Sequence, residues 1–258
     1  MHRGFTLFLT ALLLFAAACA GNKAAVPKEV PDHVRRITAL AEQGDPEARY
    51  TLGRMYAEGK SVENDFAKAA SWYRLAADQG HPLARCSLGK LFMKGRGVSQ
   101  DYREAAKWYR LAAEQGDSDA QTSLGVMYAD GKGFAQDYEA AADWFRKAAE
   151  QGNAAAQYNL GVLYIQGKGV PQRFTEAARW FRMAAEQGDA SAQYCLGVMY
   201  KEGDGVPRNS VQAYIWLSLA AERNNEKAAW TLNELARGMT KDQLEKARES
   251  VRTFRAKN

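Results

Sequence analysis

Apolar residues recur along most of this chain at the spacing of amphipathic helices. In the middle of the sequence, four of them lie at intervals of four, three and one positions and so share one helical face: Ala120, Leu124, Met127 and Tyr128. Beyond the turn Gly131-Lys132-Gly133, a second group has similar spacing: Ala141, Trp144, Phe145 and Ala148. The pattern predicts two helices, joined by a short turn, that pack together through their apolar faces.

This two-helix pattern repeats every 36 residues. Leu-Gly recurs at 52–53, 88–89, 124–125, 160–161 and 196–197, and Trp recurs at 72, 108, 144, 180 and 216. Five units therefore follow one another without an insertion, at 45–80, 81–116, 117–152, 153–188 and 189–224. Because one helix pair cannot bury its apolar face alone, this period predicts an all-α array of stacked pairs.

The residues shared by the units, A-x-x-x-LG-x-MY-x-x-G-x-G-V and then A-x-x-WY-x-x-AA-x-QG, resemble the Sel-one-like repeat family, a relative of the tetratricopeptide repeat. The resemblance covers residues 45–224. It implies a right-handed α-solenoid of five antiparallel helix pairs. It also implies a non-catalytic role in binding other proteins.

Polar residues and glycines mark where the helices begin and end. Asp65, Asp101 and Asp137 are predicted N-caps of second helices, and Asp101 with Glu104 has the spacing of a capping box. Gly152 follows the end of a second helix, where a left-handed residue commonly stands. We expect the same arrangement in each unit.

The two ends of the array depart from the repeat. Residues 33–44 match a second helix alone and predict an N-terminal capping helix, while 225–258 predict C-terminal capping helices. Within that second segment, Asn233 stands where the repeats have Gly. Thr240 and Gln243 predict a capping box at the start of the last helix.

The N-terminal sequence has the pattern of a targeting signal. Residues 1–18 contain a short apolar run ending in small residues, which is typical of a signal peptide. The sequence Ala16-Ala17-Ala18-Cys19 resembles a bacterial lipobox, which implies lipidation at Cys19 and anchoring through the lipid, with residues 19–32 as a flexible tether. We expect an exported protein in the periplasm, held at the outer membrane. Ordinary signal cleavage, giving a soluble periplasmic or secreted protein, is the alternative.

Composition and charge exclude several other classes of protein. The formal net charge is +5, and removal of 1–18 takes away one Arg and leaves 34 − 30 = +4, with no basic stripe. We therefore expect no nucleic-acid partner. The chain has three Cys and three His, which are too few Cys for a four-cysteine zinc module. We therefore expect no metal and no cofactor. Cys86 and Cys195 lie three units apart and are expected to be unpaired.

Motifs that suggest catalysis are better explained by the repeat. Ser87 and Lys90 form an S-x-x-K sequence like that of penicillin-recognising enzymes, but the companion S-D-N and K-T-G elements are missing. The Gly-x-Gly turns follow helices and lack the Lys-Ser/Thr of a phosphate-binding loop. We expect no catalytic residues and a Trp column that belongs to the core.

The candidate binding surface is the concave face that first helices line in tetratricopeptide-like stacks. Two positions on the free face of each first helix give these columns: Tyr50, Cys86, Thr122, Tyr158, Tyr194, and Arg54, Lys90, Val126, Val162, Val198. An exposed row of Tyr and Val suits the binding of an envelope protein or peptide. The alternative is that Tyr158 and Tyr194 merely pack between adjacent first helices. As functions, a β-lactamase-type envelope hydrolase and peptidoglycan-fragment binding also stay open.

Overall fold

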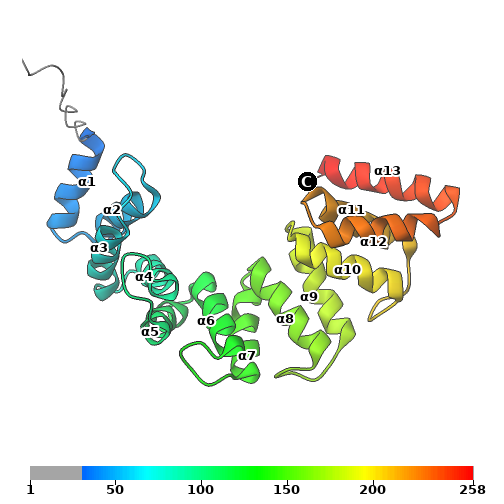
Figure 1. Ribbon diagram of the computed structural model, residues 1–258, viewed down its shortest axis with the longest axis horizontal. Coiled ribbons are helices and arrows are strands. Elements are labelled where there is room, and N and C mark those ends of the chain that lie inside the picture. The colour runs from blue at the N-terminus through cyan, green and yellow to red at the C-terminus, as the bar shows by residue number, and fades with distance from the viewer. Residues whose placement is uncertain (1–30, 258) are drawn as a thin grey trace, which may run out of the picture.

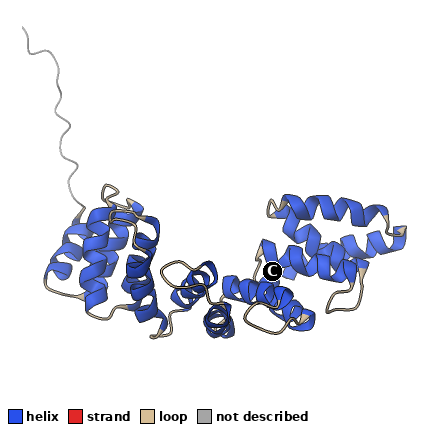
Figure 2. Ribbon diagram, turned by 60° about the horizontal axis from the view of Figure 1, so that its bottom comes forward, coloured by secondary structure: helices blue, strands red, loops and turns tan. Residues whose placement is uncertain are grey.

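The computed structural model describes residues 31–257, with side chains as far as residue 254. The predicted signal peptide, Cys19 and nearly all of the predicted tether lie outside the described residues. Within 31–257 the chain forms α-helices and no strand, as Figure 2 shows. No helix in this range is long and apolar enough to span a bilayer.

The helices follow in this order: α1 (Asp32–Glu42), α2 (Pro46–Glu58), α3 (Phe66–Asp78), α4 (Pro82–Lys94), α5 (Tyr102–Ala113), α6 (Ser118–Asp130), α7 (Tyr138–Glu150), α8 (Ala154–Gln166), α9 (Phe174–Glu186), α10 (Ala190–Glu202), α11 (Ser210–Glu222), α12 (Glu226–Arg237) and α13 (Lys241–Lys257). Five pairs run from α2/α3 to α10/α11, and each pair packs on the next. The prediction of an α-solenoid with five helix-pair repeats is confirmed.

The stacked pairs trace an open arc, with α1 at one end and α13 at the other (Figure 1). In this view α4 and α6 lie nearer the inside of the arc than their partners α5 and α7. The arc follows from the repeat itself, because each unit meets its neighbour through the same faces and the same small rotation accumulates.

The predicted helix ends are present. The Asp137 side chain accepts hydrogen bonds of 3.0 Å from the backbone N–H groups of Glu139 and Ala140. At the other end of α7, Gly152 has a φ of 90°. Asn153 N–H then bonds Ala148 O at 3.1 Å, closing the helix with the left-handed turn expected from the sequence.

One of the two predicted capping boxes is only half formed. Asp101 Oδ1 accepts from Glu104 N–H at 3.0 Å, but Asp101 N–H donates to Phe92 O, so Glu104 has no free donor to reach back to. At Thr240 and Gln243 both reciprocal bonds form, at 3.0 and 3.3 Å. The loop that crosses to Phe92 therefore replaces half of the box at Asp101.

The Leu-Gly column lets the two helices of a unit approach closely. A Cβ at Gly161 would lie 2.7 Å from Cε1 of Phe181, which is too close for any side chain. The second Gly of each Gly-x-Gly turn has a similar role between units. A Cβ at Gly169 would lie 2.1 Å from the backbone oxygen of Tyr138 in the preceding unit. These turns therefore also serve packing.

The Trp column is buried only in part. Trp108, Trp180 and Trp216 are each 5% exposed, while Trp72 and Trp144 are partly exposed but pack against the core, so the column belongs to the core as expected. The Arg74 guanidinium lies 5.8 Å from the Trp108 ring centre, and Lys147 Nζ lies 4.2 Å from the Trp144 ring centre.

The C-terminal cap does not continue the repeat. α12 takes the place of a sixth first helix, but α13 packs on α11 and makes only slight contact with α12. Asn233, which is exposed, stands where a buried Gly admits the second helix in each of the five units. A side chain at this position prevents the close approach, and a wedge opens between α12 and α13.

Candidate functional site

The predicted binding residues all lie on first helices, from α2 to α10. Arg54 and Lys90 are exposed. The others are partly buried: Tyr50, Thr122, Val126, Tyr158, Val162, Tyr194 and Val198. The two columns therefore lie on successive first helices and form a surface whose side chains are mostly half-buried.

The tyrosines of this surface pack against neighbouring helices and keep part of their rings accessible. The ring centre of Tyr50 lies 4.7 Å from that of His81 in the next unit and 5.8 Å from that of Tyr73. Tyr158 lies 5.8 Å from Phe181, and burial raises the pKa of Tyr158. These rings contribute to the stacking of units while still presenting an edge to a partner.

Cys86 departs from the expected surface column. The side chain is 3% exposed and lies beneath Lys90, whose Nζ is 3.6 Å from Asp119 Oδ2 in the next first helix. Burial raises the pKa of the Cys86 thiol to about 12. The expectation that this position lines the surface is wrong, because the ion pair across α4 and α6 covers so small a side chain.

Val126 and Val162 line one pocket. It has a volume of about 190 Å³ and lies between α6 and α8, with Asn159 and Lys168 as polar neighbours. The structure thus joins two predicted residues from adjacent units into one hollow, deep enough for an apolar side chain.

Trp230 belongs to the same surface and was missed in the sequence analysis. It is 69% exposed on α12, and its position is 36 residues after Tyr194. No following first helix covers it. Continuing the 36-residue register past the last unit would have found it, along with Glu234, which is 36 residues after Val198.

Charge changes along this surface from one end to the other. The second column begins with Arg54 and Lys90, continues through three valines, and ends at Glu234. We call the set formed by both columns without Cys86, together with Trp230 and Glu234, the first-helix surface. Its two ends therefore differ in charge.

The residues of the S-x-x-K motif have structural partners. The Ser87 hydroxyl faces that of Tyr73 in the preceding unit, while Lys90 pairs with Asp119. His81 caps α4 by accepting from Ala84 N–H at 3.2 Å, and its other ring nitrogen lies 3.0 Å from Glu47. Across residues 31–254, no cluster of three or more His, Cys, Asp or Glu is placed to hold a metal ion, and Cys86 and Cys195 are free thiols.

A family model described as the Sel1 repeat matches the chain five times, at residues 46–81, 82–117, 118–153, 154–189 and 190–225. Proteins built from these repeats are generally scaffolds for protein–protein interaction. The comparison with curated proteins gives no match.

Two solved structures are similar in both sequence and fold. The first is c5321, a protective antigen present in uropathogenic Escherichia coli strains, with 39% identity and a TM-score of 0.76 over 86% of this chain. The second is a Sel1 repeat protein from Oxalobacter formigenes, with 38% identity and a TM-score of 0.72 over 78% of this chain. The matched part spans 48% and 59% of those two proteins.

A third structure supports the fold alone. A putative sel1 repeat protein from Klebsiella pneumoniae subsp. pneumoniae shares 23% identity with a TM-score of 0.51, over 79% of this chain and 99% of its own.

Proposed function

Because this chain belongs to the Sel1 repeat family, we propose that it is a non-catalytic scaffold that binds a partner protein or peptide along its first-helix surface. The partner is an envelope protein or a segment of one. No cofactor takes part in this function.

The observation that carries the proposal is the exposure of Trp230 in register with Tyr158 and Tyr194. A Trp that is 69% exposed at the end of a row of half-exposed aromatic rings is a contact surface of the kind in which binding energy concentrates. The pocket at Val126 and Val162 supports the same surface, since it offers a hollow for one apolar side chain of the partner.

The proposed location is the bacterial cell envelope, with the chain exported and anchored by lipid at Cys19. The support is the sequence of 1–19, with its short apolar run and small residues before the Cys. Outer-membrane anchoring is supported by Ala20, since Ala and not Asp follows the Cys, and the tether by the small and polar stretch 20–32 with Pro27 and Pro31. Palmitate labelling of cells that make the wild type or Cys19→Ala tests this: label that persists in the variant, or wild type that is soluble in the periplasm, contradicts it.

A hydrolase of β-lactamase type has less support, since both Ser87 and Lys90 already contact other side chains. Turnover of a chromogenic β-lactam by wild type, absent in Ser87→Ala, would support the hydrolase hypothesis instead. Peptidoglycan-fragment binding has no observation in its favour on the first-helix surface.

The binding surface is tested by photocrosslinking in cells. A photoreactive amino acid placed at Val162 or Tyr194 is expected to capture one defined partner, identified by mass spectrometry. The same group at Leu75, an exposed residue on the second helix α3, is the control and should not capture it. Equal capture from Leu75 would place the contact elsewhere.

A set of variants then separates binding from stability. Trp230→Ala should abolish or strongly reduce capture while the thermal midpoint stays within a few degrees, because the ring is mostly in solvent. The double variant Tyr158→Ala with Tyr194→Ala should also lose the partner. The proposal fails if the thermal midpoint of the double variant falls far below that of wild type, or if Trp230→Ala captures the partner as well as wild type. Either result would mean that the aromatic row serves packing.

A further inference from the structure

A second cavity lies away from the row of aromatic rings, in the wedge between α11, α12 and α13. Its volume is about 580 Å³, which is within the range of small-ligand sites. The wedge exists because α13 packs on α11 and hardly touches α12, where Asn233 takes the place of the repeat Gly. Its α11 wall, with Tyr214, Ser218 and Glu222, corresponds to Ala70, Arg74 and Asp78 in a hollow on α3, and what the capping segment adds is the opposite wall from α13.

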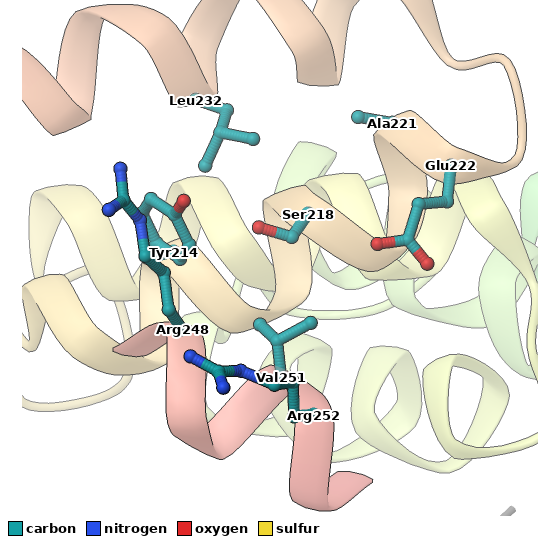
Figure 3. Close-up of a pocket in the computed structure, with 8 residues that line it drawn as sticks. All are labelled: Tyr214, Ser218, Ala221, Glu222, Leu232, Arg248, Val251 and Arg252. Carbon is teal, nitrogen blue, oxygen red and sulfur yellow. The ribbon is translucent and has the colours of Figure 1, made fainter. Parts of the chain in front are cut away.

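The wall of the cavity carries a serine hydroxyl that no described side chain uses. The Ser218 side chain is 8% exposed, and its hydroxyl makes no hydrogen bond with any other residue whose side chain is described. Figure 3 shows it pointing into the cavity. Because the hydroxyl lines the cavity and can both donate and accept a hydrogen bond, it is available to a bound molecule.

The walls of the cavity carry separated charges. Arg248 and Arg252 lie one turn apart on α13 and line it together, and neither forms an ion pair or hydrogen bond with the other described residues. Figure 3 shows the Arg248 guanidinium beside Tyr214 and the Glu222 carboxylate at the opposite end of α11, with Leu232 and Val251 between them. A ligand here meets two cations at one end, an anion at the other and apolar walls between.

We propose that this cavity binds a short peptide with free ends. The two arginines hold its terminal carboxylate, Ser218 and Tyr214 bond its backbone, and its side chains rest on Leu232 and Val251. Two neighbouring guanidinium groups suit a carboxylate because both its oxygens can accept charge-assisted hydrogen bonds.

The separation of the charges sets the length of the ligand. Tyr214 and Glu222 are eight residues apart on one helix, which corresponds to roughly 12 Å at 1.5 Å per residue. An extended peptide covers about 3.3–3.6 Å per residue, so roughly three or four residues reach from the arginines to Glu222. The terminal ammonium then lies at the carboxylate of Glu222.

Calorimetric titration of the purified full chain with three tetrapeptides tests the proposal: Ala-Ala-Ala-Ala, Ala-Ala-Ala-Leu and Ala-Ala-Ala-Phe. At least one is expected to bind saturably at or below about 1 mM. Amidation of its carboxyl terminus should weaken binding tenfold or more, and acetylation of its amino terminus should weaken it by less. If none of the three binds, or if the amide binds as well as the acid, the proposal is overturned.

Matched variants assign the effect to this cavity. Arg248→Gln with Arg252→Gln should abolish binding and leave the thermal midpoint unchanged, since both side chains are exposed. Lys241→Gln with Lys246→Gln makes the same charge change on α13 outside the cavity and should bind normally. Equal loss in both doubles would mean non-specific charge attraction. The Tyr158→Ala with Tyr194→Ala protein should keep peptide binding, which separates this site from the first-helix surface.

Discussion

The buried side-chain amide of Gln157 donates a hydrogen bond of 3.0 Å to the carbonyl oxygen of Ala149, across the boundary between two repeats. Gln121 and Gln193 make the same contact with the preceding second helix, at 3.1 and 3.0 Å. Each of these carbonyl groups also accepts a hydrogen bond of 3.0 Å from the backbone N–H of the glycine three residues later, so the glutamine amide adds a second bond that links two units. The bond therefore fixes how each unit docks on the one before.

Removal of this amide should destabilise the solenoid. Gln157→Ala removes the bond between units to the Ala149 carbonyl, which keeps its bond from Gly152 N–H, and also takes the acceptor of Gln187 Nε2, which lies 2.9 Å from Gln157 Oε1. We expect a loss of about 0.5–1.5 kcal/mol in the free energy of unfolding, measured by urea denaturation. Gln172→Ala is the control, because its bond to Ile165 O is exposed. A loss of equal size in both variants would contradict a special role for the buried amide.

Addition of a single methyl group between the two helices of a unit should destabilise the protein. Gly161→Ala forces a Cβ to within 2.7 Å of the Phe181 ring, and overpacking of this kind costs about 1–3 kcal/mol. Gly238→Ala places its Cβ no nearer than 3.7 Å to any group and should be close to neutral in the same urea titration. Wild-type stability in Gly161→Ala would show that the two helices can separate freely.

Two tryptophans of one column should differ in their effect on stability. Trp180→Ala removes a ring that is 5% exposed, and its cost is about 3–5 kcal/mol. Trp144→Ala should cost clearly less because its ring is partly in solvent. Trp180→Phe should also cost less, since Nε1 of Trp180 is buried without a hydrogen-bond partner. Equal losses for the two alanine variants would mean that exposure does not decide the difference.

The Cys86 thiol should be almost inert in the folded protein. Burial raises its pKa from 9.0 to about 12, so at neutral pH it has about a thousandfold less thiolate than a free thiol. Because the unfolded thiol ionises first, the stability contributed by this group is intact below about pH 9 and is lost as pH rises towards 12. Labelling rates of protein that carries Cys19→Ser and Cys195→Ser, with and without urea, measure this. Fast labelling of the folded protein would contradict it.

Local sequence predicted the helices, their ends and their pairing. The 36-residue spacing of Leu-Gly and Trp, the Asp137 cap and the Gly152 turn all depend on contacts within one or two units, and each contact recurs down the array. A pattern that repeats in register needs no knowledge of distant parts of the chain, because each unit touches only its neighbours.

The exposure of individual side chains was decided by the tertiary structure. Cys86 is covered by an ion pair that crosses two units, and Trp230 is open because no further first helix follows it. Sequence determined that these residues lie on helices and on which face. Burial depended on which neighbouring element packs over that face. At the C-terminal end, the position of α13, which packs on α11 and hardly on α12, could not be derived from the repeat period.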